Sequence, residues 1–317
     1  MMKPSRALLA DLEELVPGGV LRAVSLVDVS RWKIGGIADV IIRPESPEQV
    51  QALRQYFYRN NIHHIVIGMT SNLLFSDEGL RVPCIQIGSR MSKVDILCGV
   101  VQAQAGAWVP GLARKVQKAG FAGAEHICGI PGTIGGLICM NGGSQRKGIG
   151  SSVVEVTSID EAGGLHFRKA DQCRFGYRES VFQRNGEIIV NAALDFKRAP
   201  DPKLVRREMI DILSSRRRKF PQKLPNCGSV FKSDPAFYDK YGTPGAIIEK
   251  LGLKGFRIGG AVVPDVHANF IVNVGNATAS DVISVIQSIK SSAEDQLGVM
   301  LPVEVCYVNQ FGQIKAL

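Results

Sequence analysis

The chain has 317 residues, of which 45% are apolar and 21% are charged, and this composition excludes a disordered chain, a collagen-like chain and a small disulfide-stapled domain. The length favours two or three domains. Lys and Arg outnumber Asp and Glu by 38 to 29, and the net charge of +9 favours an anionic partner such as nucleic acid, an anionic membrane or a phosphorylated small molecule.

Strands and helices are predicted along the first two thirds of the chain. A helix is predicted over 8–15 and ends before Pro17-Gly18-Gly19. Another is predicted over 47–60, where Ser46 precedes it as an N-cap and apolar residues recur on one face. A third helix is predicted over 109–119. Short apolar runs predict strands over 40–42, 65–67, 85–87, 100–102, 153–159 and 188–196.

The segment Pro200-Asp201-Pro202 interrupts this pattern, and we expect a domain boundary there. Beyond it, helices are predicted over 203–218 and 281–297. The first is expected to end in a solvated basic run at 216–219, and Thr278 supplies cap chemistry for the second. Strands are predicted over 270–274 and 303–308, so the last third is expected to be a mixed α+β unit.

The cysteine and histidine patterns predict reduced thiols and no metal site. The seven cysteines are odd in number and irregularly spaced, and the five histidines have no ligand spacing. No apolar run is long enough to span a membrane, and acidic residues interrupt the N-terminal apolar stretch as they would not in a signal peptide. We therefore expect a cytoplasmic protein.

Two glycine-bearing segments are candidate anion-binding turns. The first, Gly68-Met69-Thr70-Ser71-Asn72, follows the strand at 65–67. The second spans 129–136 and is followed by Met140-Asn141-Gly142-Gly143. Turns of small residues expose backbone N–H groups and let a ligand approach closely. The second segment has neither the Rossmann nor the P-loop pattern, and ordinary turns in a β-rich domain are the alternative for both.

Three polar residues stand where they can carry chemistry. Arg178 follows Phe175-Gly176-Tyr177, and its planar guanidinium suits a carboxylate; a surface arginine stacked on Tyr177 is the alternative. Ser229 follows Gly228, on a turn that can aim one hydroxyl into a site. Glu304 lies among apolar residues of a predicted strand, where alternation favours an exposed carboxylate and a site is the alternative.

The order of these segments along the chain resembles the UDP-N-acetylenolpyruvoylglucosamine reductase (MurB) family, flavoenzymes of bacterial peptidoglycan precursor synthesis, in its shorter-looped subtype. The resemblance runs from about Lys33 to Glu304, which is most of the chain. It rests on Lys33-Ile34-Gly35-Gly36-Ile37-Ala38-Asp39, 68–74 with Asp77-Glu78-Gly79, 129–141, 175–180, 228–232, Gly252-Leu253-Lys254-Gly255, 267–273 and Asn276-Ala277-Thr278-Ala279.

The resemblance implies an α+β fold, a vanillyl-alcohol-oxidase-type (PCMH-type) FAD-binding fold with a C-terminal α+β substrate domain. It divides the chain into FAD-binding subdomain 1 (1–80), FAD-binding subdomain 2 (81–200) and a substrate-binding domain (201–317). It also implies noncovalent FAD, held by the two glycine-bearing segments at Gly68, Thr70, Ser71, Asn72, Gly129, Gly132, Thr133, Gly135, Gly136 and Asn141. The residues expected to bind substrate are Tyr177, Lys232 and Asn269.

The reaction implied is the NADPH-dependent reduction of UDP-N-acetylglucosamine enolpyruvate to UDP-N-acetylmuramate. NADPH reduces FAD, and hydride then passes to the enolpyruvyl methylene. The charge that develops on the substrate carboxylate needs a clamp, which we expect from Arg178 with the help of Glu304. The adjacent carbon needs a proton, which we expect from Ser229. The expected partner is a small UDP-sugar rather than nucleic acid or a membrane, and the chain is expected to be a monomer or weak oligomer.

Several residues depart from the family pattern and leave a second function open. A paralogous FAD oxidoreductase that acts on another nucleotide sugar is the alternative. The departures are Thr70 for a glycine, Ser30-Arg31-Trp32 for Thr-Thr-Phe-like residues, Gly142-Gly143-Ser144-Gln145 for Ala-Gly-Ala-Tyr, and Ser233-Asp234-Pro235 for Asn-Pro.

Two further functions are disfavoured by the residues themselves. A basic nucleic-acid-binding protein is disfavoured because aromatic residues make up only 7% of the chain and do not interleave with the basic run at 216–219. A flavin-binding protein without turnover is disfavoured because Arg178, Ser229 and Glu304 are all present.

Overall fold

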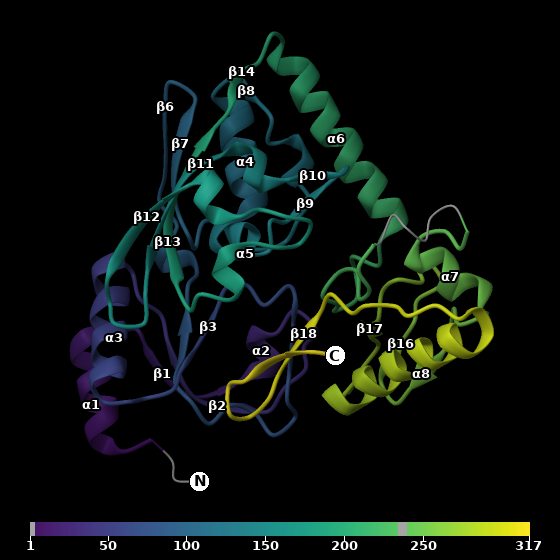
Figure 1. Cartoon of the computed structure of the whole chain (residues 1–317), viewed down its shortest axis with the longest axis horizontal. Coiled ribbons are helices and arrows are strands. Elements are labelled where there is room, and N and C mark those ends of the chain that lie inside the picture. Colours follow the sequence, from purple (N-terminus) through teal and green to yellow (C-terminus); the bar gives the residue numbers. More distant parts are fainter. Residues whose placement is uncertain (1–3, 234–239) are drawn as a thin grey trace. The chain divides into compact units, whose positions relative to one another are not determined.

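The computed structural model describes residues 4–233 and 240–317, whose helices and strands form two compact units (Figure 1). Unit 1 comprises the chain up to Arg22, Val40–Met69 and Pro83–Arg216. Unit 2 comprises Ala23–Asp39, Thr70–Val82 and Arg217–Leu317. The expected division into 1–80, 81–200 and 201–317 stays a prediction, and the departure at Asp234-Pro235 lies outside the described residues.

A four-stranded sheet has the order β1-β2-β5-β3, with β1 at Val20–Ser25, β2 at Ile37–Ile42, β5 at Cys84–Gln86 and β3 at Ile65–Ile67. The strand β5 runs parallel to both of its neighbours. Two helices, α1 (Arg6–Leu15) and α3 (Pro47–Arg59), belong to the same unit as β3 and β5. As expected, α3 begins at Ser46, whose hydroxyl accepts a hydrogen bond from Gln49 N at 3.3 Å.

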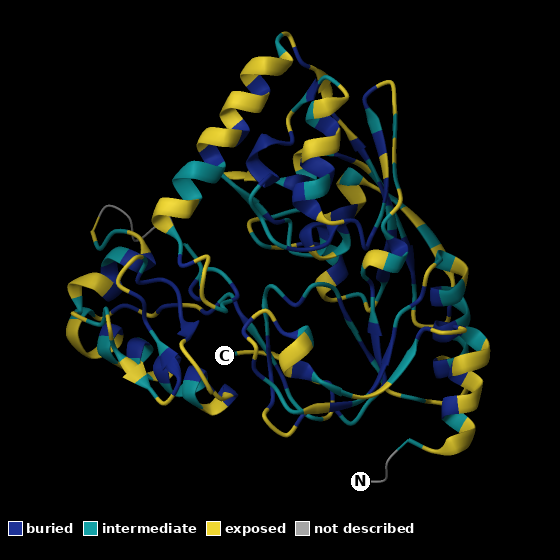
Figure 2. Ribbon diagram, turned by 180° about the vertical axis from the view of Figure 1, so that it is seen from behind, coloured by how far each residue is buried: buried dark blue, intermediate teal, exposed yellow. Residues whose placement is uncertain are grey.

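A five-stranded antiparallel sheet lies at the centre of unit 1. Its strand order is β12-β11-β13-β7-β6, and the strands are β6 (Val94–Leu97), β7 (Val100–Gln104), β11 (Val153–Ile159), β12 (Leu165–Lys169) and β13 (Ile188–Asp195). The apolar side chains of β13 and of α4 (Val109–Lys118) and α5 (Ile134–Cys139) contribute to one continuous core. Buried positions alternate with more exposed ones along β7 and, from Val190 onward, along β13. Figure 2 colours the ribbon by burial.

Shorter elements complete unit 1. Two-residue strands pair as β8 (Phe121–Ala122) with β14 (Lys197–Arg198), and β9 (Gly143–Ser144) with β10 (Lys147–Gly148). The helix α6 (Pro202–Lys219) buries Val205, Met209 and Ile212. Its basic end is not wholly solvated as expected, because Arg216 is half-buried and a Cβ placed on Gly129 would lie 2.6 Å from its Cδ.

The described part of unit 2, which omits 234–239, holds two three-stranded sheets and three α-helices. One sheet joins β4 (Leu73–Phe75), β18 (Cys306–Val308) and β19 (Ile314–Ala316), and the other joins β15 (Arg257–Ile258), β16 (Ala261–Val262) and β17 (Val272–Asn273). The helices are α2 (Leu26–Val29), α7 (Pro244–Lys250) and α8 (Ala279–Leu297). Thr278 and Asp281 cap α8 reciprocally, each side chain accepting from the other's backbone N–H at 3.0 Å.

Trp32 and Asn273 join the separate stretches of unit 2. Trp32 is fully buried, and its indole N–H donates to Ile271 O at 2.8 Å. The Asn273 side chain donates to Trp32 O at 3.0 Å and accepts from Gly275 N at 2.9 Å and Ala277 N at 3.2 Å. These side chains thus supply hydrogen-bond partners for backbone N–H and C=O groups that are not paired in a sheet. Such groups need a partner when they are buried.

The predicted helices agree with the structure to within two residues at each end, but two strands are shorter than expected. The predicted strand over 270–274 is β17, which covers only Val272–Asn273. The predicted strand over 303–308 is β18, which begins at Cys306. The preceding residues take other partners: Val303 forms an isolated bridge with Phe231, and Glu304 N donates to Val230 O. Residues 303 and 304 therefore pair with the loop at 230–231 and do not continue the strand β18.

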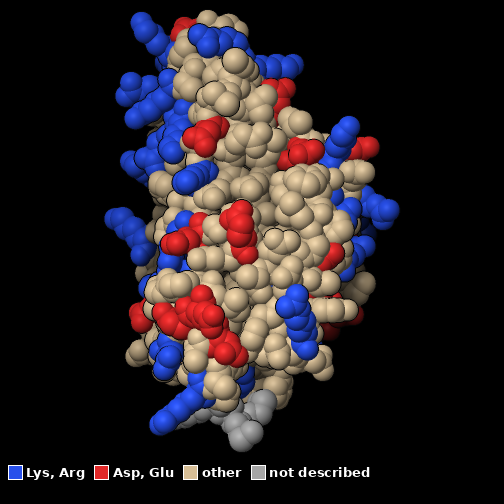
Figure 3. Space-filling model, turned by 90° about the vertical axis from the view of Figure 1, so that its left-hand side faces the viewer, with Lys and Arg blue, Asp and Glu red and all other residues tan. Residues whose placement is uncertain are grey.

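Charged side chains of both signs are interspersed on the face drawn in Figure 3. Among the described residues, no helix is both long and apolar enough to cross a membrane. None of the seven cysteines, all of which lie in the described ranges, forms a disulfide.

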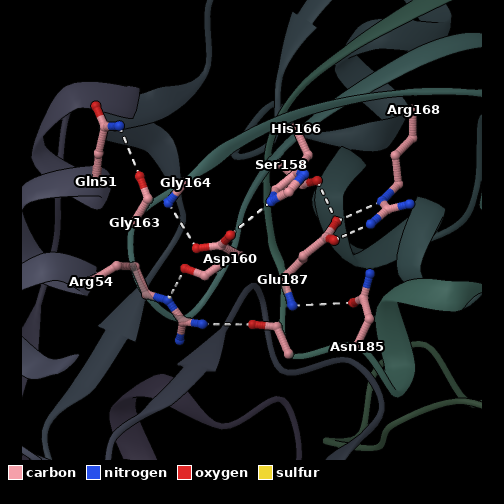
Figure 4. Close-up of polar contacts among 11 residues, drawn as sticks. Gln51, Arg54, Ser158, Asp160, Gly163, Gly164, His166, Arg168, Asn185 and Glu187 are labelled. Carbon is pink, nitrogen blue, oxygen red and sulfur yellow. Dashed lines mark hydrogen bonds and ion pairs between the residues drawn. The ribbon is translucent and has the colours of Figure 1, made fainter.

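A buried arginine ties α3 to the five-stranded sheet of unit 1 (Figure 4). Arg54 is only 5% exposed, and it donates to Asp160 O at 2.8 Å and Gly186 O at 2.7 Å. It also lies 2.8 Å from His64 Nε2. Because a guanidinium can only donate, Nε2 accepts and the ring proton sits on Nδ1, facing Ile62 O at 3.2 Å. His64 is therefore neutral in the folded chain.

We expect His64 to make the fold sensitive to acid. Burial, and then the Arg54 charge, lower its pKa from 6.5 to about 4, although its bond to Ile62 O opposes them. Between these pH values the unfolded chain binds a proton that the folded chain does not. The free energy of unfolding should thus fall as pH falls through this window, by up to ~3 kcal/mol. Urea unfolding on both sides of pH 6.5 measures this loss.

The matched variants are His64→Gln and His63→Gln. Gln at position 64 keeps an acceptor for Arg54 but does not titrate, so its unfolding energy should depend less on pH than that of the wild type. His63 is exposed, and its replacement should leave the dependence unchanged. Equal pH dependence in both variants would contradict the assignment to His64.

Candidate active site

Gly68, the first residue of one glycine-bearing segment, lies against the other segment in unit 1. Gly68 follows directly after β3, and a Cβ placed on it would lie 2.6 Å from Thr133 Oγ1. Only glycine permits this approach, because a real Cβ would collide with the hydroxyl. Thr133 is 3% exposed and caps α5, accepting from Gly136 N at 3.4 Å. The turn after β3 and the start of α5 therefore lie side by side.

The segment from Gly129 to Gly136 is attached to the end of the five-stranded sheet. Gly135 N donates to Ala105 O at 2.8 Å, and Ile134 N donates to Ala107 O at 2.9 Å. Gly132 has φ +152, a conformation that favours glycine. Gly136 is exposed, and a Cβ there would meet only Thr133 Oγ1, at 3.5 Å, so the backbone surface beside it is open.

Asn141 connects this segment to the loop that carries Arg178. Its side-chain Nδ2 donates to Gly176 O at 2.7 Å, and its Oδ1 accepts from Gly150 N at 2.9 Å. A second link comes from Ser180, whose hydroxyl donates to Cys139 O at 2.6 Å. The structure thus places Asn141, expected from sequence to bind FAD, between the glycine segment and the Arg178 loop.

Arg178 is half-buried in a strained turn. Its φ is +56, and Gly176 and Glu179 pair across it as an isolated bridge. The guanidinium lies 5.3 Å from the centre of the Tyr177 ring, and its Nη2 donates to Gly143 O at 3.4 Å. Arg178 therefore stacks on Tyr177, which was the alternative for this arginine in the sequence analysis. Tyr177 is 58% exposed, so the pair has a face open to a ligand.

In unit 2, Thr70 and Asn72 form bonds that sequence patterns do not reveal. Thr70 is 3% exposed; its hydroxyl donates to Val29 O at 3.0 Å and accepts from Arg31 N at 3.1 Å. The departure from glycine at this position, with φ +55, thus anchors the end of α2. The Asn72 side chain donates to Glu304 O at 3.0 Å, while Ser71 beside it is half-buried.

The segment with Ser229 runs beside the segment with Glu304. Gly228 has φ +81, and its N–H donates to Asn226 Oδ1 at 3.0 Å, which fixes the turn before Ser229. Glu304 N donates to Val230 O at 2.7 Å, and Lys232 N donates to Pro302 O at 2.8 Å. Ser229, Lys232 and Glu304 are all half-buried. The alternation argument for an exposed Glu304 is therefore not confirmed.

Asn269 has surroundings that the sequence did not predict. It is 5% exposed, and its amide exchanges two hydrogen bonds with the Phe231 backbone, at 2.9 Å and 3.0 Å. One N–H donor and one acceptor lone pair of the amide are therefore bound to the protein backbone. The expectation that Asn269 binds the substrate stays a prediction. Sequence reasoning also missed Arg216 beside Gly129, because a basic run at a helix end indicates solvent exposure. Across the described part of the chain, no group of His, Cys, Asp and Glu forms a metal site.

Comparison with known proteins connects these features. Residues 38–168 match the family described as "FAD binding domain", and residues 220–308 match the C-terminal domain of UDP-N-acetylenolpyruvoylglucosamine reductase. UDP-N-acetylenolpyruvoylglucosamine reductase 1 of Corynebacterium glutamicum is 40% identical over 292 residues, which cover 92% of this chain and 87% of that protein. This chain belongs to the UDP-N-acetylenolpyruvoylglucosamine reductase (MurB) family.

Other MurB proteins agree in sequence and in fold. The reductase of a Synechococcus species is 37% identical, with 92% of this chain and 95% of that protein covered. The crystal structure of MurB from Thermus caldophilus superposes with a TM-score of 0.77 at 28% identity, covering 91% of this chain and 98% of that chain. The family resemblance and the expected α+β FAD-binding fold with its C-terminal domain are confirmed.

The residues of unit 1 fit the FAD that this family uses. Gly68 leaves room for the Thr133 hydroxyl, and Gly136 is exposed with open space beside its backbone. Backbone N–H groups in such a turn suit a pyrophosphate. The expected FAD contacts of the individual residues stay predictions.

We expect the FAD to be noncovalent. Covalent attachment requires a reactive His or Cys, and His126 and Cys128 lie next to the glycine segment. His126 is 4% exposed and Cys128 3% exposed, and burial raises the pKa of the Cys128 thiol, which lowers its thiolate fraction. Acid precipitation of the purified yellow protein should leave the flavin in the supernatant. Flavin that stays with the washed pellet would overturn this expectation.

Proposed function

We propose that this chain reduces the enolpyruvyl ether of UDP-N-acetylglucosamine to UDP-N-acetylmuramate, with NADPH as the electron source. The observation that carries the proposal is the 40% identity to a reductase of this name over 92% of the chain. The link through Asn141 between the glycine segment and the Arg178 loop supports it. As a MurB-family FAD oxidoreductase, the chain acts in peptidoglycan precursor synthesis, and so in cell-wall biogenesis, cell shape and division.

The cofactor contacts proposed follow from the segments described. Gly68, Gly132, Gly135 and Gly136 present backbone without side chains, and Thr133 and Asn141 fix the turns in which they stand. Gly129, Thr70, Ser71 and Asn72 complete the proposed set. FAD bound there would supply hydride-transfer chemistry between NADPH and the enolpyruvyl methylene carbon. Every other step depends on the side chains of this chain.

Arg178 is proposed to hold the substrate carboxylate. Addition of hydride to the methylene carbon pushes an electron pair toward the carboxylate, where negative charge builds up. A guanidinium offers two parallel N–H donors and keeps its charge at all working pH values. Stacking on Tyr177 orients its plane, because Tyr177 presents its ring at 5.3 Å. Tyr177 and Lys232 are proposed to contact the substrate.

Ser229 is proposed to deliver the proton that completes the reaction. Its O–H bond breaks as a C–H bond forms at the carbon that carries the ether oxygen, and the serine oxygen then regains a proton from solvent. Glu304 is proposed to carry a proton and donate it toward the carboxylate oxygens in the same step. The hydrogen bonds between the backbones of the Ser229 and Glu304 segments hold these two residues next to each other.

The reaction itself has a direct test. Purified protein should show a flavin spectrum that NADPH bleaches and that UDP-N-acetylglucosamine enolpyruvate restores. Bleaching without restoration by this sugar, but with restoration by another carboxylated nucleotide sugar, would assign the chain to the paralogous function. The cytoplasm, where NADPH is available, is the proposed location, and the proposed state is a monomer or weak oligomer.

Arg178→Lys should reduce turnover by ~100-fold or more while the fold is retained, because one ammonium cannot make a planar two-point contact. The measurement is kcat/KM beside a thermal unfolding curve. Arg174→Lys is the matched control, since Arg174 lies in the same loop, is exposed and also has positive φ, at +49. Activity of Arg178→Lys within a few-fold of the control would remove the clamp from the mechanism.

Ser229→Ala should separate the two half-reactions. Bleaching by NADPH should stay near the wild-type rate, because that step does not use the hydroxyl. Restoration by the enolpyruvyl substrate should slow by ~100-fold or more, the scale of a lost general acid. Stopped-flow absorbance follows both steps in one sample. A structural serine would instead slow both steps or lower the thermal midpoint, and normal restoration would exclude Ser229 as the donor.

A further inference from the structure

A side chain, rather than a strand, holds the backbone next to Ser229. Asn269 Nδ2 donates to Phe231 O at 3.0 Å, and Asn269 Oδ1 accepts from Phe231 N at 2.9 Å. The Asn269 carbonyl accepts from Val230 N at 2.9 Å. Asn269 therefore binds both residues that directly follow Ser229, which are Val230 and Phe231. It pairs with the N–H and with the C=O of Phe231.

The opposite edge of the same stretch is paired with the Glu304 segment. Glu304 N donates to Val230 O at 2.7 Å, and Phe231 bridges Val303. The backbone after Ser229 thus has Asn269 on one edge and the Glu304 segment on the other. Residues 230 and 231 are at most 1% exposed, so an edge without a protein partner would leave buried polar groups unpaired.

An asparagine has the chemistry that this edge requires. Its amide carries a donor and an acceptor side by side, which match the C=O and N–H of one residue. An aspartate at this position would set a carboxylate oxygen against the Phe231 carbonyl, and an apolar residue would leave both groups unpaired. The turn at Gly228, with φ +81, prevents the stretch from continuing as a regular strand toward Ser229.

We propose that Asn269 is a positioning residue for proton transfer from Ser229. This inference rests on the proposed function and concerns the bonds of Asn269 to the backbone, whereas the expected substrate contact of Asn269 stays a separate prediction. Asn269 holds the backbone at Val230 and Phe231, and the position of the Ser229 hydroxyl follows from that of Val230. It does not touch the reacting atoms. Its loss should therefore slow the proton-transfer step at saturating substrate and leave substrate affinity nearly unchanged.

Asn273 offers matched control variants. It lies in the same unit, is 7% exposed, and its amide likewise bonds backbone groups, at Trp32, Gly275 and Ala277. Asn269→Ala and Asn273→Ala should both lower the thermal midpoint. Only Asn269→Ala should slow restoration of the flavin spectrum by the enolpyruvyl substrate, by ~10-fold or more, the scale seen for lost supporting residues. Bleaching by NADPH should be unchanged in both.

A double variant tests whether Asn269 acts through Ser229. If it does, Asn269→Ala should add no further slowing to Ser229→Ala, because the hydroxyl that it positions is already absent. Multiplicative slowing in Asn269→Ala/Ser229→Ala would overturn the proposal. If Asn269→Ala does not fold, Asn269→Asp takes its place in the single and double variants, because Asp keeps the acceptor for Phe231 N.

The remaining outcomes are distinguishable. Slowing of both half-reactions, or weaker substrate binding at an unchanged limiting rate, would overturn the positioning role. Equal effects of the Asn269 and Asn273 variants on restoration would do the same. If the wild-type flavin is bleached by NADPH but the enolpyruvyl sugar does not restore it, the proposed function fails, independently of Asn269.

Discussion

Buried backbone groups must find hydrogen-bond partners, and the segments proposed to carry chemistry in this protein cannot find them in regular sheets. Asparagine side chains supply the partners instead. Asn141 joins Gly176 to Gly150 in unit 1, and Asn72, Asn269 and Asn273 hold backbone groups in unit 2. The loops thereby keep irregular shapes and unusual dihedral angles, such as φ +56 at Arg178, without losing their hydrogen bonds.

Glycine and asparagine act as complements in this arrangement. Glycine removes a side chain where two segments must approach, as at Gly68 against Thr133, whereas asparagine adds an amide where two segments would otherwise stay unlinked. Both devices fix geometry rather than add large apolar contacts. The large apolar contacts that stabilise the fold lie in the core of the five-stranded sheet instead. The shapes of the loops therefore depend on their hydrogen bonds.

The sequence predicts the parts of the fold that follow from periodicity. The helices α3 and α8 carry apolar residues at helical spacing and recognisable caps at Ser46 and Thr278, and both are present. The glycine segments and Arg178 were also identifiable, because few other patterns concentrate glycine and place an arginine beside an aromatic ring. The hydrogen bonds of Asn269 were not identifiable, since their partner Phe231 lies 38 residues away and backbone groups have no sequence signature. Arg216 beside Gly129 was missed for another reason, because a basic run at a helix end indicates solvent exposure.

The discontinuity of unit 2 determines when it can form during synthesis. Its strand β4 pairs with β18, and Trp32 bonds to Ile271, so these residues depend on partners that are made more than 200 residues later. The ribosome releases Trp32 and β4 long before their partners exist, and neither stretch can reach its buried position until Ile271 and β18 have been made. A fragment that starts at Arg217 would lack both stretches and expose the apolar surface that they cover.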